Sequence, residues 1–95
     1  MTEKQQLSVL KKVQKWIESR ISSEDISYRT GEDGLSYSQY ASAKYPFISF
    51  EGELYSLLNY GEDGWKFKEE FDTFLSKLGF YYELGEAWNL TLYKI

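Results

Sequence analysis

The stretch WKFKEEFDTFLSKL, residues 65–78, carries the clearest periodic pattern in the chain. Its apolar members recur three or four positions apart, which is the spacing of one helix face: Phe67, Phe71, Phe74, Leu75 and Leu78. Gly79 follows as a residue that readily ends a helix in the left-handed conformation. The spacing therefore predicts a helix over 65–78 whose apolar stripe is buried against a sheet.

The N-terminal segment predicts a second amphipathic helix. Thr2 and Gln5 have the spacing of a capping box, in which each side chain bonds the backbone N–H of the other residue. An apolar stripe follows at helical spacing: Val9, Leu10, Val13, Trp16 and Ile17. We expect this helix to end near Ile21, because residues 22–25 are typical of a turn or a cap.

Five segments have the β-branched, aromatic or alternating residues that are typical of strands: 26–30, 35–40, 47–50, 80–84 and 88–95. We expect the first two to pair as a hairpin around residues 31–34, and the last two to pair around residues 85–87. Residues 53–60 fit both a helix and a strand, and we favour a short helix.

The order of these elements indicates an α+β fold. A chain of 95 residues is expected to form a single compact domain, residues 1–95. The strands cluster instead of alternating with helices, which favours an antiparallel sheet. We therefore expect a small antiparallel sheet of about five strands, with the N-terminal helix and one or two central helices covering one face.

The tetrapeptide GEDG occurs twice, at residues 31–34 and 61–64. The first copy is flanked by a strand-like pattern and the second by a helical one, so the two copies do not mark a duplicated unit. We interpret both as exposed turns, in which glycine allows positive φ and aspartate bonds its local backbone. Asp63 is also placed to cap the helix over 65–78.

A calcium loop at the second GEDG is the sharper alternative. Alignment on Gly64 places Asn59, Asp63 and Glu70 at ligand positions of a twelve-residue loop. Gly61 then occupies position 3 of the loop, which is also a ligand position, without offering a side-chain oxygen. Neither copy ends in GK[ST], so neither resembles a phosphate loop. We therefore expect both copies to be turns, and we expect no bound metal.

The chain contains no cysteine and no histidine. Disulfides, thiolate metal sites, Ser-His and Cys-His triads and HExxH zinc sites are therefore excluded. We expect no enzymatic activity, no catalytic residue and no cofactor. The N-terminus is too polar for a signal peptide, and no apolar run reaches the length of a membrane span, so we expect a soluble cytoplasmic protein that binds no membrane.

Charge is distributed unevenly along the chain. Residues 1–20 carry five basic and two acidic side chains, whereas residues 21–95 carry six basic and thirteen acidic ones. An acidic body argues against direct nucleic-acid binding, whose electrostatic footprint is a basic patch. It also leaves an alternative open, in which a protein from a phage or other mobile element mimics nucleic acid and inhibits a nuclease or defence system.

We expect a small acidic protein-interaction or regulatory module. Nine tyrosines are more than a domain of this size can bury, and tyrosine is enriched at protein interfaces. The expected partner is a protein, with a basic surface as the complement to the acidic body, and a homodimer is left open. The candidate partner-binding residues join the two GEDG turns to nearby tyrosines: Glu32, Asp33, Tyr37, Tyr40, Tyr60, Glu62 and Asp63.

Overall fold

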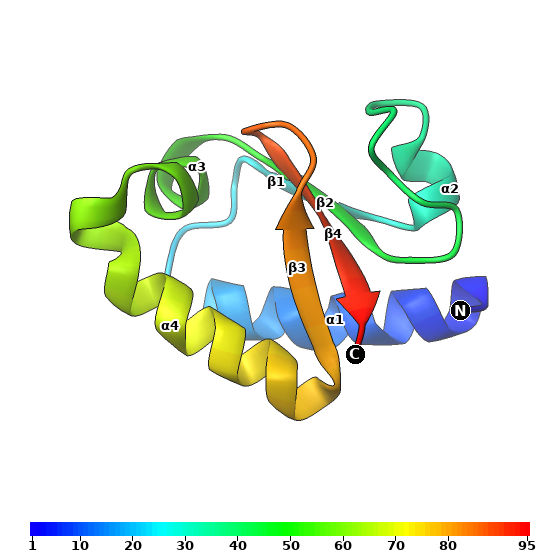
Figure 1. Ribbon diagram of the computed structural model, residues 1–95, viewed down its shortest axis with the longest axis horizontal. Coiled ribbons are helices and arrows are strands. Elements are labelled where there is room, and N and C mark those ends of the chain that lie inside the picture. The colour runs from blue at the N-terminus through cyan, green and yellow to red at the C-terminus, as the bar shows by residue number, and fades with distance from the viewer.

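A computed structural model describes residues 1–95 of the chain, apart from the side chains of Glu62 and Asp63. The elements follow one another in this order (Figure 1): α1 Glu3–Glu18, β1 Ile26–Arg29, α2 Gly31–Gly34, β2 Phe47–Phe50, α3 Gly52–Asn59, α4 Gly61–Leu78, β3 Phe80–Leu84 and β4 Asn89–Lys94. The predicted capping box of α1 is confirmed: the Thr2 side chain accepts from the Gln5 N–H, and the Gln5 side chain accepts from the Thr2 N–H.

The four strands form one antiparallel sheet in the order β1-β2-β4-β3. The predicted α+β class with an antiparallel sheet is confirmed, with four strands in place of about five. Ile48 of β2 pairs with Leu90 of β4, and Tyr82 of β3 pairs with Leu92 of β4. The predicted hairpin around residues 85–87 is therefore confirmed, since it joins β3 to β4.

The structure contradicts the predicted hairpin of residues 26–30 and 35–40. β1 pairs with β2 instead, and the first GEDG forms the short helix α2 with Thr30 at its N-cap. Residues 35–40 make turns and no strand. Their alternating pattern misleads because its apolar members, Leu35 and Tyr37, are exposed and do not face a core.

Three of the four glycines in the two GEDG copies, Gly31, Gly34 and Gly64, serve close packing, and none of the four has the positive φ that a hairpin turn would need. A Cβ atom on Gly34 would lie 2.6 Å from the ring of Phe47, and one on Gly31 would collide with backbone carbonyls. In the second copy, a Cβ atom on Gly64 would collide with the carbonyl of Leu57. The glycines therefore bring α2 onto the sheet and α4 onto α3.

The second GEDG is the first turn of α4, which begins at Gly61 and not at the predicted Trp65. Tyr60 holds the N-cap position without a side-chain hydrogen bond. The predicted cap by Asp63 concerns a side chain outside the described residues. The short helix predicted over residues 53–60 is confirmed as α3, and Gly79 ends α4 with a φ of 89° as predicted.

One face of the sheet carries the main core. Helices α1 and α4 lie side by side against it (Figure 1), and α3 closes one end. Leu90 and Leu92 of β4 are fully buried under Val13 and Ile17 of α1 and under Phe71 of α4, within one continuous cluster. The two amphipathic stripes thus form a single core with the sheet.

The predicted stripe of α4 is buried unevenly. Phe71 and Leu75 are fully buried, whereas Phe74 and Leu78 are only partly buried. The expectation of full burial is wrong for these two, because they point toward the boundary between α4 and α1. There the Phe74 ring stacks on the Trp16 ring of α1, with centroids 5.0 Å apart.

The opposite face of the sheet is covered in part by the segment 30–46, which connects β1 to β2. Phe47 and Thr91, which pair across β2 and β4, are buried beneath it. The buried side chain of Gln6 ties the segment to α1, since its carbonyl oxygen accepts from the Gly31 N–H and its amide donates to the Ala43 carbonyl. The segment is therefore anchored although it contains no strand.

Candidate protein-interaction surface

The structure separates the predicted partner-binding residues into two groups. Glu32 and Asp33 are exposed on α2, and Tyr37 and Tyr40 follow on the same segment, each with 52% of its surface exposed. Tyr60 is 65% exposed but belongs to the corner between α3 and α4. Figure 1 shows this corner and α2 at opposite ends of the molecule, so one continuous patch does not form.

The predicted contribution of Glu62 and Asp63 concerns side chains outside the described residues. Their backbone lies in the first turn of α4. This helical backbone also argues against a calcium loop at the second GEDG. A calcium loop would need an open chain between Asn59 and Glu70, but residues 61–70 are helical. The Asn59 amide instead donates to the carbonyls of Tyr55 and Ala87, at 2.9 and 2.8 Å.

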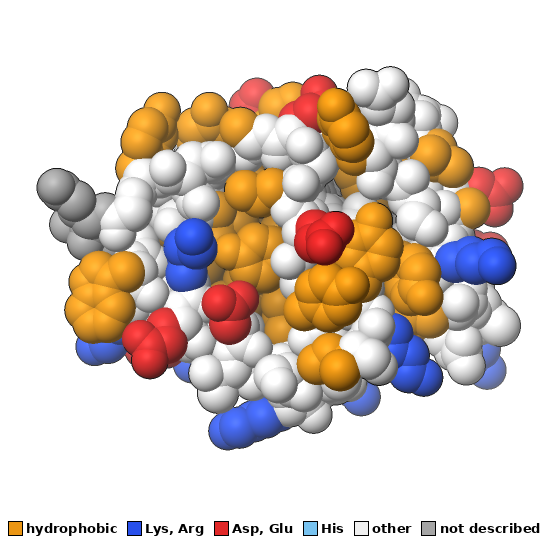
Figure 2. All heavy atoms as spheres, viewed as in Figure 1, with side chains coloured by type: hydrophobic (Ala, Val, Ile, Leu, Met, Phe, Trp, Pro, Cys, Tyr) orange, Lys and Arg blue, Asp and Glu red, His pale blue; other side chains and the backbone are white. Residues whose placement is uncertain are grey.

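A cluster of tyrosines extends the first group across the sheet. Tyr81 and Tyr93 pair across β3 and β4 with ring centroids 5.7 Å apart, and Tyr45 approaches Tyr93 at 5.2 Å. Tyr40 and Tyr93 line one shallow hollow, in which Tyr40 packs against Gly85. Figure 2 shows hydrophobic side chains, a class that includes tyrosine, gathered over the β3–β4 hairpin.

We call Tyr40, Tyr45, Tyr81 and Tyr93 the tyrosine surface; Tyr37 lies apart from it, beside Arg29. Of the four residues of the tyrosine surface, only Tyr40 was predicted from the sequence as part of a binding patch, and Tyr45, Tyr81 and Tyr93 were not. The signal for Tyr81 and Tyr93 was present, since pairing β3 with β4 around residues 85–87 sets both on one face of the hairpin. No comparable pattern places Tyr45, because its position depends on the path of the segment 30–46.

Hydrogen bonds hold this segment in place. The Ser38 hydroxyl donates to the Glu86 carboxylate at 2.6 Å, and the buried Asn89 amide donates to the same oxygen at 3.3 Å. The Ser38 oxygen also accepts from the Tyr40 N–H at 3.1 Å. The network connects the segment to the β3–β4 turn and presents Tyr40 from an ordered backbone.

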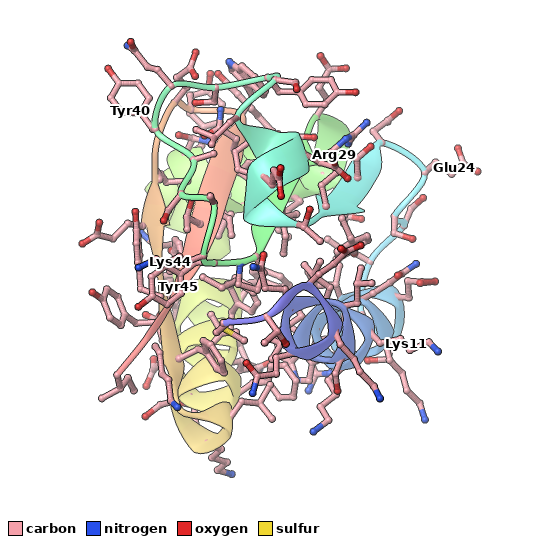
Figure 3. All side chains as sticks on the ribbon, turned by 90° about the vertical axis from the view of Figure 1, so that its right-hand side faces the viewer. Lys11, Glu24, Arg29, Tyr40, Lys44 and Tyr45 are labelled. Atoms are coloured by element: carbon pink, nitrogen blue, oxygen red, sulfur yellow. The ribbon has the colours of Figure 1, made fainter. Side chains whose placement is uncertain are left out.

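On the other side of α2, Tyr37 interacts with Arg29 of β1. The guanidinium lies 4.2 Å from the ring centroid and donates to the Tyr37 hydroxyl at 3.2 Å. Glu24 and Glu51 line the hollow that these two residues border. Figure 3 shows Tyr40 and Tyr45 on one side of α2, with Arg29 and Glu24 on the other. Arg29 therefore already interacts with Tyr37, whereas the nearby carboxylates are exposed to solvent.

Two further tyrosines belong to the core side of the sheet. Burial raises the pKa of Tyr82 to about 12, and the Asp72 carboxylate adds to this shift. Burial also raises the pKa of Tyr28, with Glu18 as the second cause. Both residues pack against the main cluster of apolar side chains, so they are separate from the tyrosine surface.

The arrangement is suited to binding, because rings and carboxylates are presented together from a fixed scaffold. Among the side chains that the structure describes, no three acidic groups gather closely enough to hold a metal ion. The described helices also include none with both the length and the apolarity needed to cross a membrane. Neither family models, curated proteins nor solved structures yielded a match to this chain.

Proposed function

We propose that the protein is a small acidic interaction or regulatory module that binds a protein partner through the tyrosine surface. The observation that carries the proposal is the exposure of Tyr40 and Tyr81, with 52% and 45% of their surfaces open to solvent. Tyrosine combines a large apolar area with a hydroxyl at low entropic cost, which favours it at the centre of interfaces.

The available area is large enough to matter. Removing about 100 Å² of each exposed ring from water would contribute on the order of 2 kcal/mol, at about 25 cal/mol per Å². Two such rings contribute about 4 kcal/mol together, which is what a weak, millimolar contact needs before the costs of association are subtracted. The rigid backbone of the segment limits those costs, because Tyr40 is already held by the Ser38 network.

The exposed carboxylates around α2 support a basic partner. Glu32 and Asp33 lie on α2, and Glu24 and Glu51 border the hollow beside Arg29. Such charges contribute more to the rate of association than to the final affinity. Association with a basic partner should therefore slow as salt rises, because screening acts over about 10 Å at 0.1 M salt.

The alternative, a nucleic-acid mimic that inhibits a nuclease or defence system, has weaker support. A duplex carries one charge per about 1.7 Å of its axis, and a mimic needs carboxylates in a comparably dense row. Here tyrosines interrupt the carboxylates: Glu32 and Asp33 are followed by Tyr37 and Tyr40. A mimic would compete with DNA for its target, which distinguishes it from the proposed module.

The test compares tyrosines at the two ends of the molecule. Tagged wild type, Tyr40→Ala, Tyr81→Ala and Tyr60→Ala would be used to capture partners from the source cells, and affinities for the recovered protein would then be measured. We expect Tyr40→Ala and Tyr81→Ala to weaken binding about tenfold or more, because each removes an anchor. Tyr60→Ala is the matched control, because Tyr60 is even more exposed than Tyr40 and Tyr81 but is remote from the tyrosine surface.

Two results would contradict the proposal. One is equal binding by wild type and both surface variants while their folds are intact. The other is a loss with Tyr60→Ala that matches the loss with Tyr40→Ala. Competition of the recovered partner's binding by DNA would favour the nucleic-acid mimic.

A further inference from the structure

A second candidate surface lies on the helical side of the molecule, away from the tyrosine surface. A hollow of about 590 Å³ runs between α1 and α4 and is lined by Trp16, Trp65 and Phe74. A second hollow of about 370 Å³ shares Trp16 and Phe74 and continues toward Leu78. The two hollows adjoin at the stacked Trp16 and Phe74 side chains, and we call them together the α1–α4 groove.

Aromatic side chains form the floor and one wall of this groove. Trp16 stacks on Phe74 and on the buried Phe71, with centroids 5.0 and 5.4 Å apart. Trp65, near the start of α4, has 62% of its surface exposed. An exposed tryptophan beside a half-buried one offers an apolar anchoring site that the fold itself leaves uncovered.

The rim of the groove is basic, although the chain as a whole is acidic. Among the side chains that the structure describes, seven charged ones line the two hollows, and five of these are basic: Lys12, Lys15, Arg20, Lys66, Lys77, Glu69 and Glu70. All seven are exposed. The chain contains eleven basic residues in total, so nearly half of them surround this groove.

The ion pair between Arg20 and Glu70 at the rim still allows Arg20 to bind an acidic ligand. The Arg20 guanidinium lies 3.6 Å from the Glu70 carboxylate and 3.9 Å from the centroid of Trp16. Both partners of the pair are well exposed, and exposed pairs contribute little to stability. A ligand carboxylate could therefore replace Glu70 beside Arg20 at small cost.

We propose that the α1–α4 groove binds an acidic amphipathic helix of a partner protein. Its apolar residues would contact Trp16, Trp65 and Phe74, and its carboxylates would meet the lysines along the rim. A groove between two helices is a common receptor for such a helix. The eighteen residues of α4 span about 27 Å at 1.5 Å per residue, which matches a helix of several turns.

Charge and stacking favour this occupant over two others. A single-stranded nucleic acid needs several free ring faces on which successive bases stack. Trp65 is well exposed, but the Trp16 ring already stacks on Phe74 and lies beneath Arg20. A second copy of this chain would place its acidic tyrosine surface in the basic groove. That contact is head-to-tail and does not close into a dimer.

The proposal is independent of the proposed function, because the two surfaces share no residue. The test uses a synthetic helical peptide of about 14 residues, long enough for about four turns, with leucines on one face and glutamates on the other. It contains no tryptophan, so the indole N–H signals of ¹⁵N-labelled protein report on binding. The three tryptophans, Trp16, Trp65 and Trp88, give three such signals.

We expect the peptide to shift the indole signals of Trp16 and Trp65 and to leave Trp88 unchanged, because Trp88 lines a hollow beside Glu24 and Ser49 instead. Lys66→Glu with Lys77→Glu should weaken binding about tenfold or more, since both charges at the rim are reversed. Lys44→Glu is the control, because Lys44 is exposed on the segment 30–46 and lines neither hollow of the groove.

Four outcomes would overturn the proposal. They are no shift of the Trp16 and Trp65 signals at millimolar peptide, a shift of Trp88 alone, equal affinity for a peptide with lysine in place of glutamate, and equal weakening by Lys44→Glu. Tighter binding of an oligothymidine than of the acidic peptide, with the same two signals shifted, would assign the groove to single-stranded nucleic acid instead. The dispersion of the backbone NMR signals would verify that each variant is folded.

Discussion

Phe71→Ala tests the core on which both surfaces depend. Phe71 is fully buried and contacts the rings of Trp16, Phe67 and Tyr82 at centroid distances of 5.4, 5.8 and 5.4 Å. Truncating a buried phenylalanine costs about 3–5 kcal/mol, because apolar contacts are lost and a cavity remains. That loss is a large part of the about 5–15 kcal/mol that stabilises an ordinary domain.

Urea denaturation followed by tryptophan fluorescence would measure the loss. With a slope of about 1.5 kcal/mol per molar urea, a loss of about 4 kcal/mol lowers the midpoint by nearly 3 M. Phe74→Ala is the matched control, and it should lose less than half as much, because Phe74 is only partly buried. If Phe71→Ala fails to fold, Phe71→Leu keeps the comparison measurable.

Two results would refute this reasoning about the core. A loss below about 1 kcal/mol for Phe71→Ala would mean that the cavity collapses or that the ring is not in the core. A loss for Phe74→Ala equal to that for Phe71→Ala would mean that the whole stripe of α4 is buried alike, as its spacing alone predicts.

Three other predictions address packing, pH and metal. Gly34→Ala should cost about 1–3 kcal/mol, because its Cβ would meet the Phe47 ring, whereas Gly61→Ala has open space around it and should be neutral or stabilising in thermal unfolding. Tyr82 should titrate near pH 12 in ultraviolet absorbance; since its pKa lies above the ordinary 10.0, its contribution to stability is complete below pH 10 and is lost as pH rises toward 12. Excess chelator should leave the melting temperature unchanged, and a clear decrease would revive the calcium alternative.

The parts of the fold that sequence periodicity predicted are those whose apolar residues face the core. The stripes of α1 and α4 contact the same buried cluster, and successive residues of β3 and β4 alternate between the two faces of the sheet. In such elements the local pattern and the tertiary contacts agree, so the pattern is sufficient. The left-handed Gly79 likewise follows from a local rule.

The segment 30–46 escaped prediction because its structure depends on contacts distant in sequence. Gly31 and Gly34 are required by the neighbouring backbone and by Phe47, and Gln6 of α1 bonds the segment from the other side. A glycine in an acidic tetrapeptide resembles a turn in sequence whether it needs positive φ or close packing. Only the partner that approaches the glycine distinguishes the two cases.

The candidate surfaces also divide into features that the sequence predicts and features that depend on contacts distant in sequence. Exposure of some tyrosines followed from their number, but their grouping depended on the hairpin register and on the path of the segment 30–46. The α1–α4 groove was not predicted from the sequence at all, because helical spacing alone assigns Trp16 and Phe74 to the core. They line a groove because α1 and α4 meet along their stripes and leave the outer edge of each stripe uncovered.

The α1–α4 groove offers a structural reason for the uneven distribution of charge along the chain. Lys12, Lys15 and Arg20 are three of the five basic residues among the first twenty, and they border the groove together with Lys66 and Lys77, more than forty residues later in the chain. A basic excess needed only for solubility has no reason to gather around exposed tryptophan. Reversing Lys66 and Lys77 separates the two explanations, because solubility would tolerate the reversal, whereas a groove for an acidic helix would lose its ligand.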